Sequence, residues 1–229
     1  MGDSSALLDL QEQAAETIVT HPPDPPPQRH LHRWIWFITG PTACGKTTVA
    51  KALAAELDFT FVEGDDFHPK ANVDKMSRGE PLTDDDRAGW LQALREHETA
   101  QPPRPKPNDS SASPPPPLPH MVMTCSALKQ HYRDVLRAGA VAAGDLRIGF
   151  VFLDGPEPLL ATRAAVRKGH FAGPELVHSQ FLALERPGDD EGDVILVGVD
   201  RALEDTQRDV TNKVKEVMMR DDGSYLALQ

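Results

Sequence analysis

The sequence has few cysteines and no long apolar run, and each shortage excludes a class of protein. Two cysteines, Cys44 and Cys125, cannot form a disulfide framework, so we expect a reduced, cytoplasmic protein. No apolar run approaches the ~20 residues that span a bilayer. The first residues lack the charged and apolar regions of a signal peptide, and Ala6 stands where a myristoylation signal has Ser or Thr. We therefore expect no membrane partner.

Basic side chains are also in short supply. The chain has 24 Lys and Arg residues against 35 Asp and Glu residues, which gives a formal net charge of -11. Nucleic acids and anionic membranes attract proteins through clustered basic residues, and they repel a protein with an acidic surface. The charge balance therefore argues against nucleic acid as a partner.

Proline is concentrated in two tracts. Of 21 prolines, five lie within residues 21–29 and nine within residues 101–120. Such stretches cannot bury a core, so we expect a flexible N-terminal arm over residues 1–33 and a solvated surface insertion over residues 101–119. The first part of the arm is amphipathic, which leaves a partner-binding helix as the alternative. The remaining chain, residues 34–229, has the size and composition of one α/β domain.

Apolar strands and amphipathic helices alternate along this domain. Predicted strands cover residues 34–39, 59–62, 121–125, 147–153 and 194–199. Predicted helices lie at about residues 49–57, 83–97, 129–136, 156–170, 174–184 and 203–217. Thr83 should cap the second helix, and residues 68–79 form a polar, basic stretch before it. This alternation predicts a three-layer α/β fold, in which helices flank a five-stranded parallel sheet.

The most specific motif is a glycine-bounded loop between the first strand and its helix, which fits G-x-x-x-x-G-K-[ST]. Its two glycines allow the backbone N–H groups to point inward at phosphate oxygens. A lysine then lies between the terminal phosphates, and a hydroxyl can ligate Mg²⁺. A chance match is the alternative, but the strand–loop–helix context favours a phosphate-binding loop. The predicted ATP-binding residues are Gly40, Pro41, Thr42, Ala43, Cys44, Gly45, Lys46, Thr47 and Thr48.

Two acidic residues, Glu63 and Asp65, follow the second predicted strand. In a parallel sheet, residues just beyond the carboxyl ends of the strands face the ligand. We therefore expect these carboxylates to serve Mg²⁺ and a substrate hydroxyl, with Thr47 and Glu63 as the metal-binding pair.

Basic residues gather near the same edge of the predicted sheet. Lys75 and Arg87 come from the insertion before the third strand, and Lys129 and Arg133 follow that strand. Each alone is more often a solvated charge, but together they suggest an anionic acceptor beside ATP. Aromatic residues that could stack on a base are scarce here, so a small polyhydroxylated carboxylate fits better than a nucleoside monophosphate.

Several segments resemble the gluconokinase family, in the order that the family has them. They are residues 63–69 (EGDDFHP), 72–87 (NVDKMSRGEPLTDDDR), 125–129 with 131–134 (CSALK, HYRD), 167–171 (RKGHF), and 179–181 with 184–187 (SQF, LERP). The resemblance spans about residues 35–215. It implies an adenylate-kinase-like P-loop kinase fold with a lid, ATP and Mg²⁺ as co-substrates, phosphorylation of D-gluconate at its 6-hydroxyl, and a homodimer.

Site roles follow from the motif and the resemblance together. Predicted catalytic residues are Lys46, Asp65, Arg163 and Arg167, with Asp65 taking the proton of the acceptor hydroxyl. Arg163 and Arg167 lie four residues apart, so they share a helix face and should approach the nucleotide as a lid at Gly169 and His170 closes. Predicted substrate-binding residues are Asp65, His68, Lys75, Arg87, Lys129, Arg133, His170 and Gln180.

Two features depart from the family pattern: the proline-rich insertion, and Glu63 at a position that usually holds Asp in small-acid kinases. A shikimate kinase, a nucleoside-monophosphate kinase and a non-catalytic ATP-binding module remain alternatives. Cys44, beside a helix N-terminus and Lys46, suggests a thiol whose thiolate is favoured. The alternative is a small residue that the tight loop accepts.

Overall fold

The computed structural model describes residues 32–99, 120–143, 146–166 and 173–221. The predicted N-terminal arm, apart from its last two residues, lies outside the described residues, as does the predicted insertion 101–119. The same holds for residues 167–172, which contain the predicted lid.

Five parallel strands form one sheet. They are β1 (Arg33–Thr39), β2 (Thr60–Val62), β3 (Met121–Thr124), β4 (Leu146–Asp154) and β5 (Val194–Gly198). Their order is β2-β3-β1-β4-β5. The chain first moves to one side of β1 and then to the other, and ligands bind at the carboxyl ends of the strands where such an order reverses.

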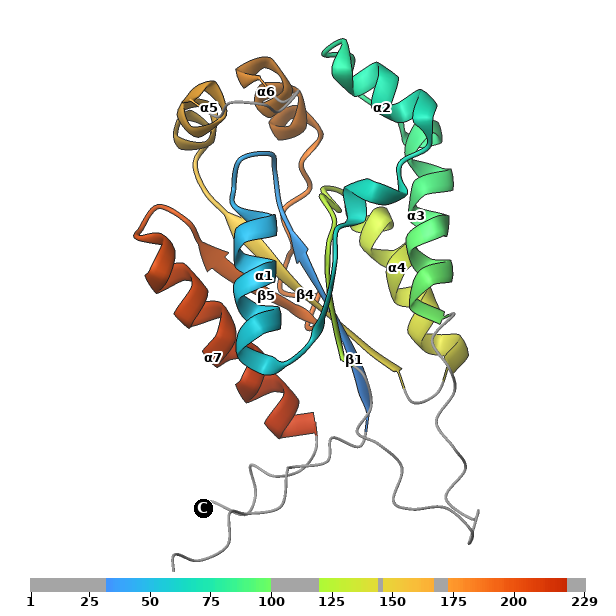
Figure 1. Cartoon of the computed structure of the whole chain (residues 1–229), viewed down its shortest axis with the longest axis vertical. Helices are drawn as coiled ribbons and strands as arrows, with labels where there is room; N and C mark the ends of the chain where they lie inside the picture. The colour runs from blue at the N-terminus through green and yellow to red at the C-terminus, as the bar shows by residue number, and fades with distance from the viewer. Residues whose placement is uncertain (1–31, 100–119, 144–145, 167–172, 222–229) are drawn as a thin grey trace, which may run out of the picture.

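Helices cover both faces of this sheet (Figure 1), so the predicted three-layer fold is confirmed. On one face lie α1 (Lys46–Leu57) and α7 (Leu203–Asp221), and on the other α3 (Asp84–Thr99) and α4 (Gln130–Ala143). At the carboxyl end of the strands lie α2 (Lys70–Ser77), α5 (Glu157–Val166) and α6 (Pro174–Ala183). No described helix has the length and apolar character that crossing a membrane requires.

Two helical segments were not predicted: α2 and the 3-10 turn η1 (Gly64–Phe67). The prediction missed α2 because the helix buries little of its surface and so lacks an apolar stripe, Asn72 being its buried residue. Helix α4 also continues past the predicted end at residue 136, as far as Ala143.

The core lies on both faces of β1, which is buried along its whole length. Trp34 and Trp36 face α1 and α7 and stack with ring centroids 5.1 Å apart, whereas Phe37 packs on Phe150 on the opposite face. This alternation is the two-residue period of a strand. Gly149 on β4 leaves room for the indole, since a Cβ there would lie 2.4 Å from the Trp36 ring.

Candidate active site

The loop between β1 and α1 has the curled backbone that the motif predicts. Gly40 and Gly45 have φ values of 126° and 100°, and Ala43 has a φ of 65°, all in the left-handed region. A Cβ at Gly40 would also lie 2.6 Å from the Leu153 carbonyl oxygen. Glycine at position 40 is therefore required both by its conformation and by the space available.

Lys46 and Thr47 begin α1 and project from this loop in different directions. The Lys46 Nζ donates hydrogen bonds to the carbonyls of Gly40 and Pro41, each at 3.1 Å. The Thr47 hydroxyl donates to the Glu63 carboxylate at 2.8 Å. The lysine thus lies across the loop itself, while the threonine joins α1 to the end of β2.

Glu63 connects the ends of strands β2 and β3 to the start of helix α1. Besides Thr47, it accepts a hydrogen bond from the hydroxyl of Thr124, the last residue of β3, and the Gly64 N–H donates to that hydroxyl at 3.0 Å. A Cβ at Gly64 would lie 1.8 Å from the Thr124 carbonyl oxygen, so this close approach requires glycine. Sequence reasoning did not single out Thr124, although its position at a strand's carboxyl end is a usable signal.

Thr47, Glu63 and Thr124 present oxygen atoms, which suit Mg²⁺. Within the described part of the chain, no group of three or more His, Cys, Asp and Glu residues could hold a metal by itself. A single carboxylate beside a hydroxyl therefore fits a Mg²⁺ ion that arrives with phosphates and keeps several waters.

Asp65 lies in η1, immediately after β2, and its side chain is 73% exposed. The His68 Nε2 lies 4.0 Å from its carboxylate. The turn is held from below by Trp90, whose indole N–H donates to the Gly64 carbonyl at 2.7 Å. Asp65 therefore sits on a fixed turn with its carboxylate open to a ligand.

His68 differs from the prediction that it binds substrate directly. Its side chain is 4% exposed and stacks on Trp90 with ring centroids 4.2 Å apart. Burial lowers the pKa of the imidazole, although the nearby Asp65 acts in the opposite direction. We therefore assign His68 to supporting the turn that carries Asp65.

Two of the predicted basic residues each bind a carboxylate at the start of α3. The Lys129 Nζ lies 2.8 Å from both oxygens of Asp84, and the Lys75 Nζ lies 2.7 and 2.8 Å from those of Asp86. These lysine hydrogen bonds are the main reason that the pKa of each carboxyl falls to about 2. The lysines are thus held at the edge of the site by ion pairs.

The predicted cap of α3 is confirmed. The Thr83 hydroxyl accepts a hydrogen bond from the Asp86 N–H at 3.2 Å, and the Asp86 carboxylate accepts one from the Thr83 N–H at 2.8 Å. This reciprocal pair is a capping box with Asp in place of Glu, and it fixes the first turn that holds the lysines.

Arg87 joins Lys75 and Lys129 in a basic group, and Tyr132 lies beside it. The Arg87 guanidinium lies 5.7 Å from the centre of the Tyr132 ring and donates to the carbonyls of Leu82 and Thr83. The Tyr132 hydroxyl donates to Asp84 at 2.5 Å. Lys129, just before α4, and Tyr132 on α4 therefore both bind Asp84, and Arg87 on α3 lies beside the same tyrosine ring.

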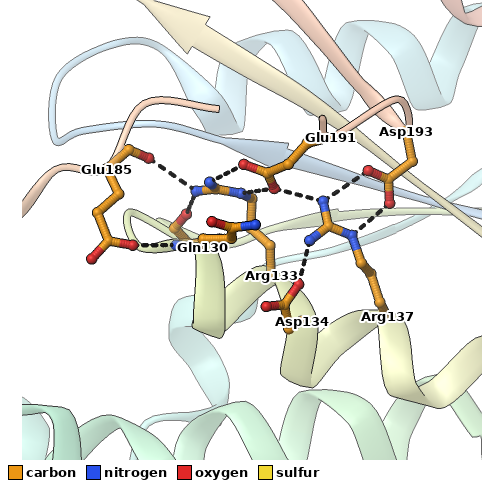
Figure 2. A network of polar contacts seen from close by, with 8 residues as sticks. Gln130, Arg133, Asp134, Arg137, Glu185, Glu191 and Asp193 are labelled. Carbon is orange, nitrogen blue, oxygen red and sulfur yellow. Dashed lines mark hydrogen bonds and ion pairs between the residues drawn. The ribbon is translucent and has the colours of Figure 1, made fainter. Parts of the chain in front are cut away.

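Arg133 corrects one prediction, because it cannot reach a substrate. Its side chain is fully buried, and its guanidinium donates to both carboxylate oxygens of Glu191 and to the carbonyls of Ala127 and Glu185 (Figure 2). With its donors used inside the protein, Arg133 does not belong among the substrate-binding residues.

Gln180 and Arg163 lie on helices beside the phosphate-binding loop. The Gln180 side-chain oxygen accepts a hydrogen bond from the Thr42 N–H at 2.6 Å, so this predicted substrate ligand contacts the ATP loop instead. Arg163, on α5, donates to the Val199 carbonyl at 2.9 Å. Arg167 and His170 lie outside the described residues.

The prediction of a reactive Cys44 is wrong. The thiol is 2% exposed, and burial raises its pKa more than the charge of Lys46 lowers it. Burial also raises the pKa of the Cys125 thiol. Desolvation penalises a thiolate strongly, so Cys44 is a small apolar residue of the tight loop.

Comparisons with known proteins show the family of the chain, although no family model matches it. The chain is 38% identical over 175 residues to the thermoresistant gluconokinase of Escherichia coli K12, covering 76% of this chain and 89% of that one. It is 45% identical over 159 residues to the gluconokinase of Gluconobacter oxydans, covering 67% and 76%. A crystal structure of a gluconokinase from Sinorhizobium meliloti superposes with a TM-score of 0.67 at 32% identity, covering 88% of this chain and 100% of that one. The chain therefore belongs to the gluconokinase family.

Proposed function

We propose that this protein catalyses the ATP-dependent phosphorylation of D-gluconate to 6-phospho-D-gluconate. The observation that carries the proposal is the meeting of three features at the carboxyl edge of one sheet. These are the phosphate-binding loop at residues 40–47, the exposed carboxylate of Asp65, and the basic group that includes Lys129. A phosphate donor and an anionic acceptor can thus lie side by side.

The phosphate-binding loop holds ATP through its inward N–H groups and the amino end of α1. The Lys46 Nζ, which bonds to the carbonyls of Gly40 and Pro41, exchanges these partners for the β- and γ-phosphates. Thr47 and Glu63 hold the Mg²⁺ that accompanies ATP, with Thr124 orienting the carboxylate. Bound Mg²⁺ supplies positive charge that offsets the charge of the phosphates.

Asp65 orients the acceptor hydroxyl and accepts its proton as the phosphoryl group is transferred. Phosphoryl transfer requires little covalent chemistry from the protein, so correct placement of the two substrates contributes most. The fixed turn beneath Asp65 is suited to this, since His68 and Trp90 hold it by stacking and by the hydrogen bond to Gly64.

Lys75, Arg87 and Lys129 bind the carboxylate and hydroxyls of the acceptor. The two lysines already bind carboxylates, Asp86 and Asp84, so they have the chemistry and the reach that a sugar-acid carboxylate needs. Arg163, together with Arg167 and His170 of the proposed lid, acts on the nucleotide side and excludes water.

A reduced, cytoplasmic setting and a homodimer are further parts of the proposal. Both cysteines are free and buried, which suits a reducing compartment. Light scattering during size-exclusion chromatography measures whether the purified chain forms the dimer.

The test is ADP release by purified protein and MgATP with gluconate, shikimate or AMP supplied in parallel. We expect release that depends on gluconate, with 6-phosphogluconate identified as the product. Release with shikimate or AMP alone would assign another kinase of the same fold. Equal release with and without gluconate would refute the proposal, and ATP binding without any transfer would indicate a nucleotide-binding module.

A further inference from the structure

Arg133 lies buried between two segments that are far apart in the chain. The first is the loop between β3 and α4, and the second, residues 184–193, joins α6 to β5 (Figure 2). The guanidinium binds the Ala127 carbonyl at 3.0 Å in the first segment, and the Glu185 carbonyl at 3.3 Å and the Glu191 carboxylate in the second. One side chain thus joins the two segments.

The β3–α4 loop needs such support because its backbone is strained. Ala127 has a φ of 38°, in a region that a residue with a Cβ rarely adopts. The residue's carbonyl is the one that Arg133 binds. The next carbonyl, that of Leu128, accepts the Glu185 N–H at 2.9 Å, and the Glu185 carboxylate accepts the Gln130 N–H at 2.8 Å. Contacts from residues 184–193 therefore hold the loop in shape.

This loop carries groups that reach the active site from both its ends. The Ser126 carbonyl accepts the N–H of Gly40, the first glycine of the phosphate-binding loop, at 3.1 Å. Lys129, at the other end of the loop, is one of the proposed acceptor-binding residues and forms an ion pair with Asp84. A change in the conformation of Ala127 would move Lys129 directly, whereas Gly40 is also held by β1.

We propose that Arg133, paired with Glu191, is a positioning residue that holds Lys129 where it binds the carboxylate of the acceptor. The inference rests on the proposed function, because it assigns Lys129 to the sugar acid. It also explains why Arg133 resembles a substrate ligand in sequence while it is buried in the structure: the residue acts through the loop.

Stability alone is a weak reason for such a pair. A buried ion pair is often matched in stability by apolar residues of similar volume, because both charges must be desolvated. The neighbouring Arg137 provides the matched comparison. It binds Glu191, Asp193 and Asp134, and none of these three residues lies in the β3–α4 loop. Removing Arg137 therefore perturbs the same network without releasing Lys129.

The experiment compares four enzymes: wild type, the double variant Arg133→Met/Glu191→Leu, the single variant Arg133→Lys, and the control Arg137→Met. The double variant removes both charges together, so that neither is left buried without a partner. Melting temperature, kcat, and KM for gluconate and for MgATP are measured for each. We expect the KM for gluconate to rise about 10-fold in the double variant, because Lys129 would lose its charge-assisted contact with the gluconate carboxylate.

The KM for MgATP should stay within about 2-fold of wild type, because the phosphate-binding loop keeps its own support from β1 and α1. The loss of the Lys129 contact should affect only the KM for gluconate, by about the free energy of one charged hydrogen bond. Arg133→Lys should give a smaller rise for gluconate, because lysine keeps the charge but not all the carbonyl bonds. Arg137→Met should change neither KM.

An unchanged gluconate KM in the folded double variant would overturn the positioning role, and so would an equal rise in both KM values. If the double variant does not fold, the Arg133→Lys variant decides: its KM for gluconate should rise more than its KM for MgATP, and equal or absent changes would overturn the positioning role. The proposed function is judged separately, from the wild type: an enzyme without gluconate-dependent ADP release would overturn both proposals, whereas an active wild type with unaffected variants would overturn this one alone.

Discussion

Replacing Glu98 by Gln should remove a pH-dependent loss of stability from the protein. Glu98 lies near the end of α3, and its side chain is fully buried. Among the described residues, neither of its carboxylate oxygens has a hydrogen-bond partner. A Cβ at Gly139 on α4 would lie 2.6 Å from one of these oxygens, so the carboxyl packs against the backbone of the neighbouring helix.

Burial raises the pKa of Glu98 from 4.5 to about 8. Arg95 on α3 and Arg33 on β1 act in the opposite direction, but their effect is smaller than that of burial. The folded protein therefore binds a proton that the unfolded chain has released between pH 4.5 and 8. The stability that this proton provides is complete below pH 4.5 and is lost as the pH rises to 8.

The size of the effect follows from the two pKa values. The difference between 4.5 and about 8 corresponds to at most about 5 kcal/mol of unfolding free energy. A domain of this size loses about 2–4 °C in melting temperature per kcal/mol, so the wild type should lose on the order of 10 °C between pH 5 and 9 from this group.

Melting temperatures measured by circular dichroism from pH 5 to pH 9 test this. Glu98→Gln keeps the shape of the side chain but cannot ionise, so its melting temperature should fall less with pH than that of the wild type. Glu96→Gln, which changes an exposed carboxyl two residues earlier, is the matched control and should follow the wild type. Parallel curves for wild type and Glu98→Gln would refute the reasoning, because they would show that Glu98 is not the buried acid that titrates.

Three further predictions concern the active site and the insertion. Asp65→Asn should lower kcat by about 10²–10⁴-fold with the KM for MgATP largely unchanged, because an amide cannot accept the proton. Asp66→Asn next to it is the control, and near-normal turnover in Asp65→Asn would exclude the residue as the base. Glu63→Gln should raise the Mg²⁺ concentration needed for half-maximal activity by about 10-fold or more, and an unchanged Mg²⁺ titration would contradict the metal assignment. Replacing residues 101–119 with a short Gly/Ser linker should leave kcat and melting temperature nearly unchanged, since closing a loop costs only ~0.6 kcal/mol per doubling of its length. A large loss of either would show that the tract packs on the core.

Local chemistry was enough to predict the phosphate-binding loop and the order of the elements. The positive φ values of Gly40 and Gly45 are required by the curl of the loop, and the pattern G-x-x-x-x-G-K-T records that requirement within eight residues. The five strands were predicted because each is a short apolar run, and the Thr83 cap because a hydroxyl three residues before Asp86 meets a free N–H. Helix α2 was missed because it buries too little to leave a periodic pattern.

Tertiary structure alone decided which charged and polar groups are open to a ligand. The sequence puts Arg133 four residues after Lys129, but Glu191, which lies 58 positions further on, takes its guanidinium out of reach of substrate. Cys44 has a cation and a helix N-terminus beside it in sequence, yet packing from other strands and helices buries the thiol and raises its pKa. Desolvation and ion pairing depend on neighbours that are distant in the chain. For this reason the sequence by itself determined the phosphate chemistry and the fold, whereas folding determined which of its charges lie at the active site.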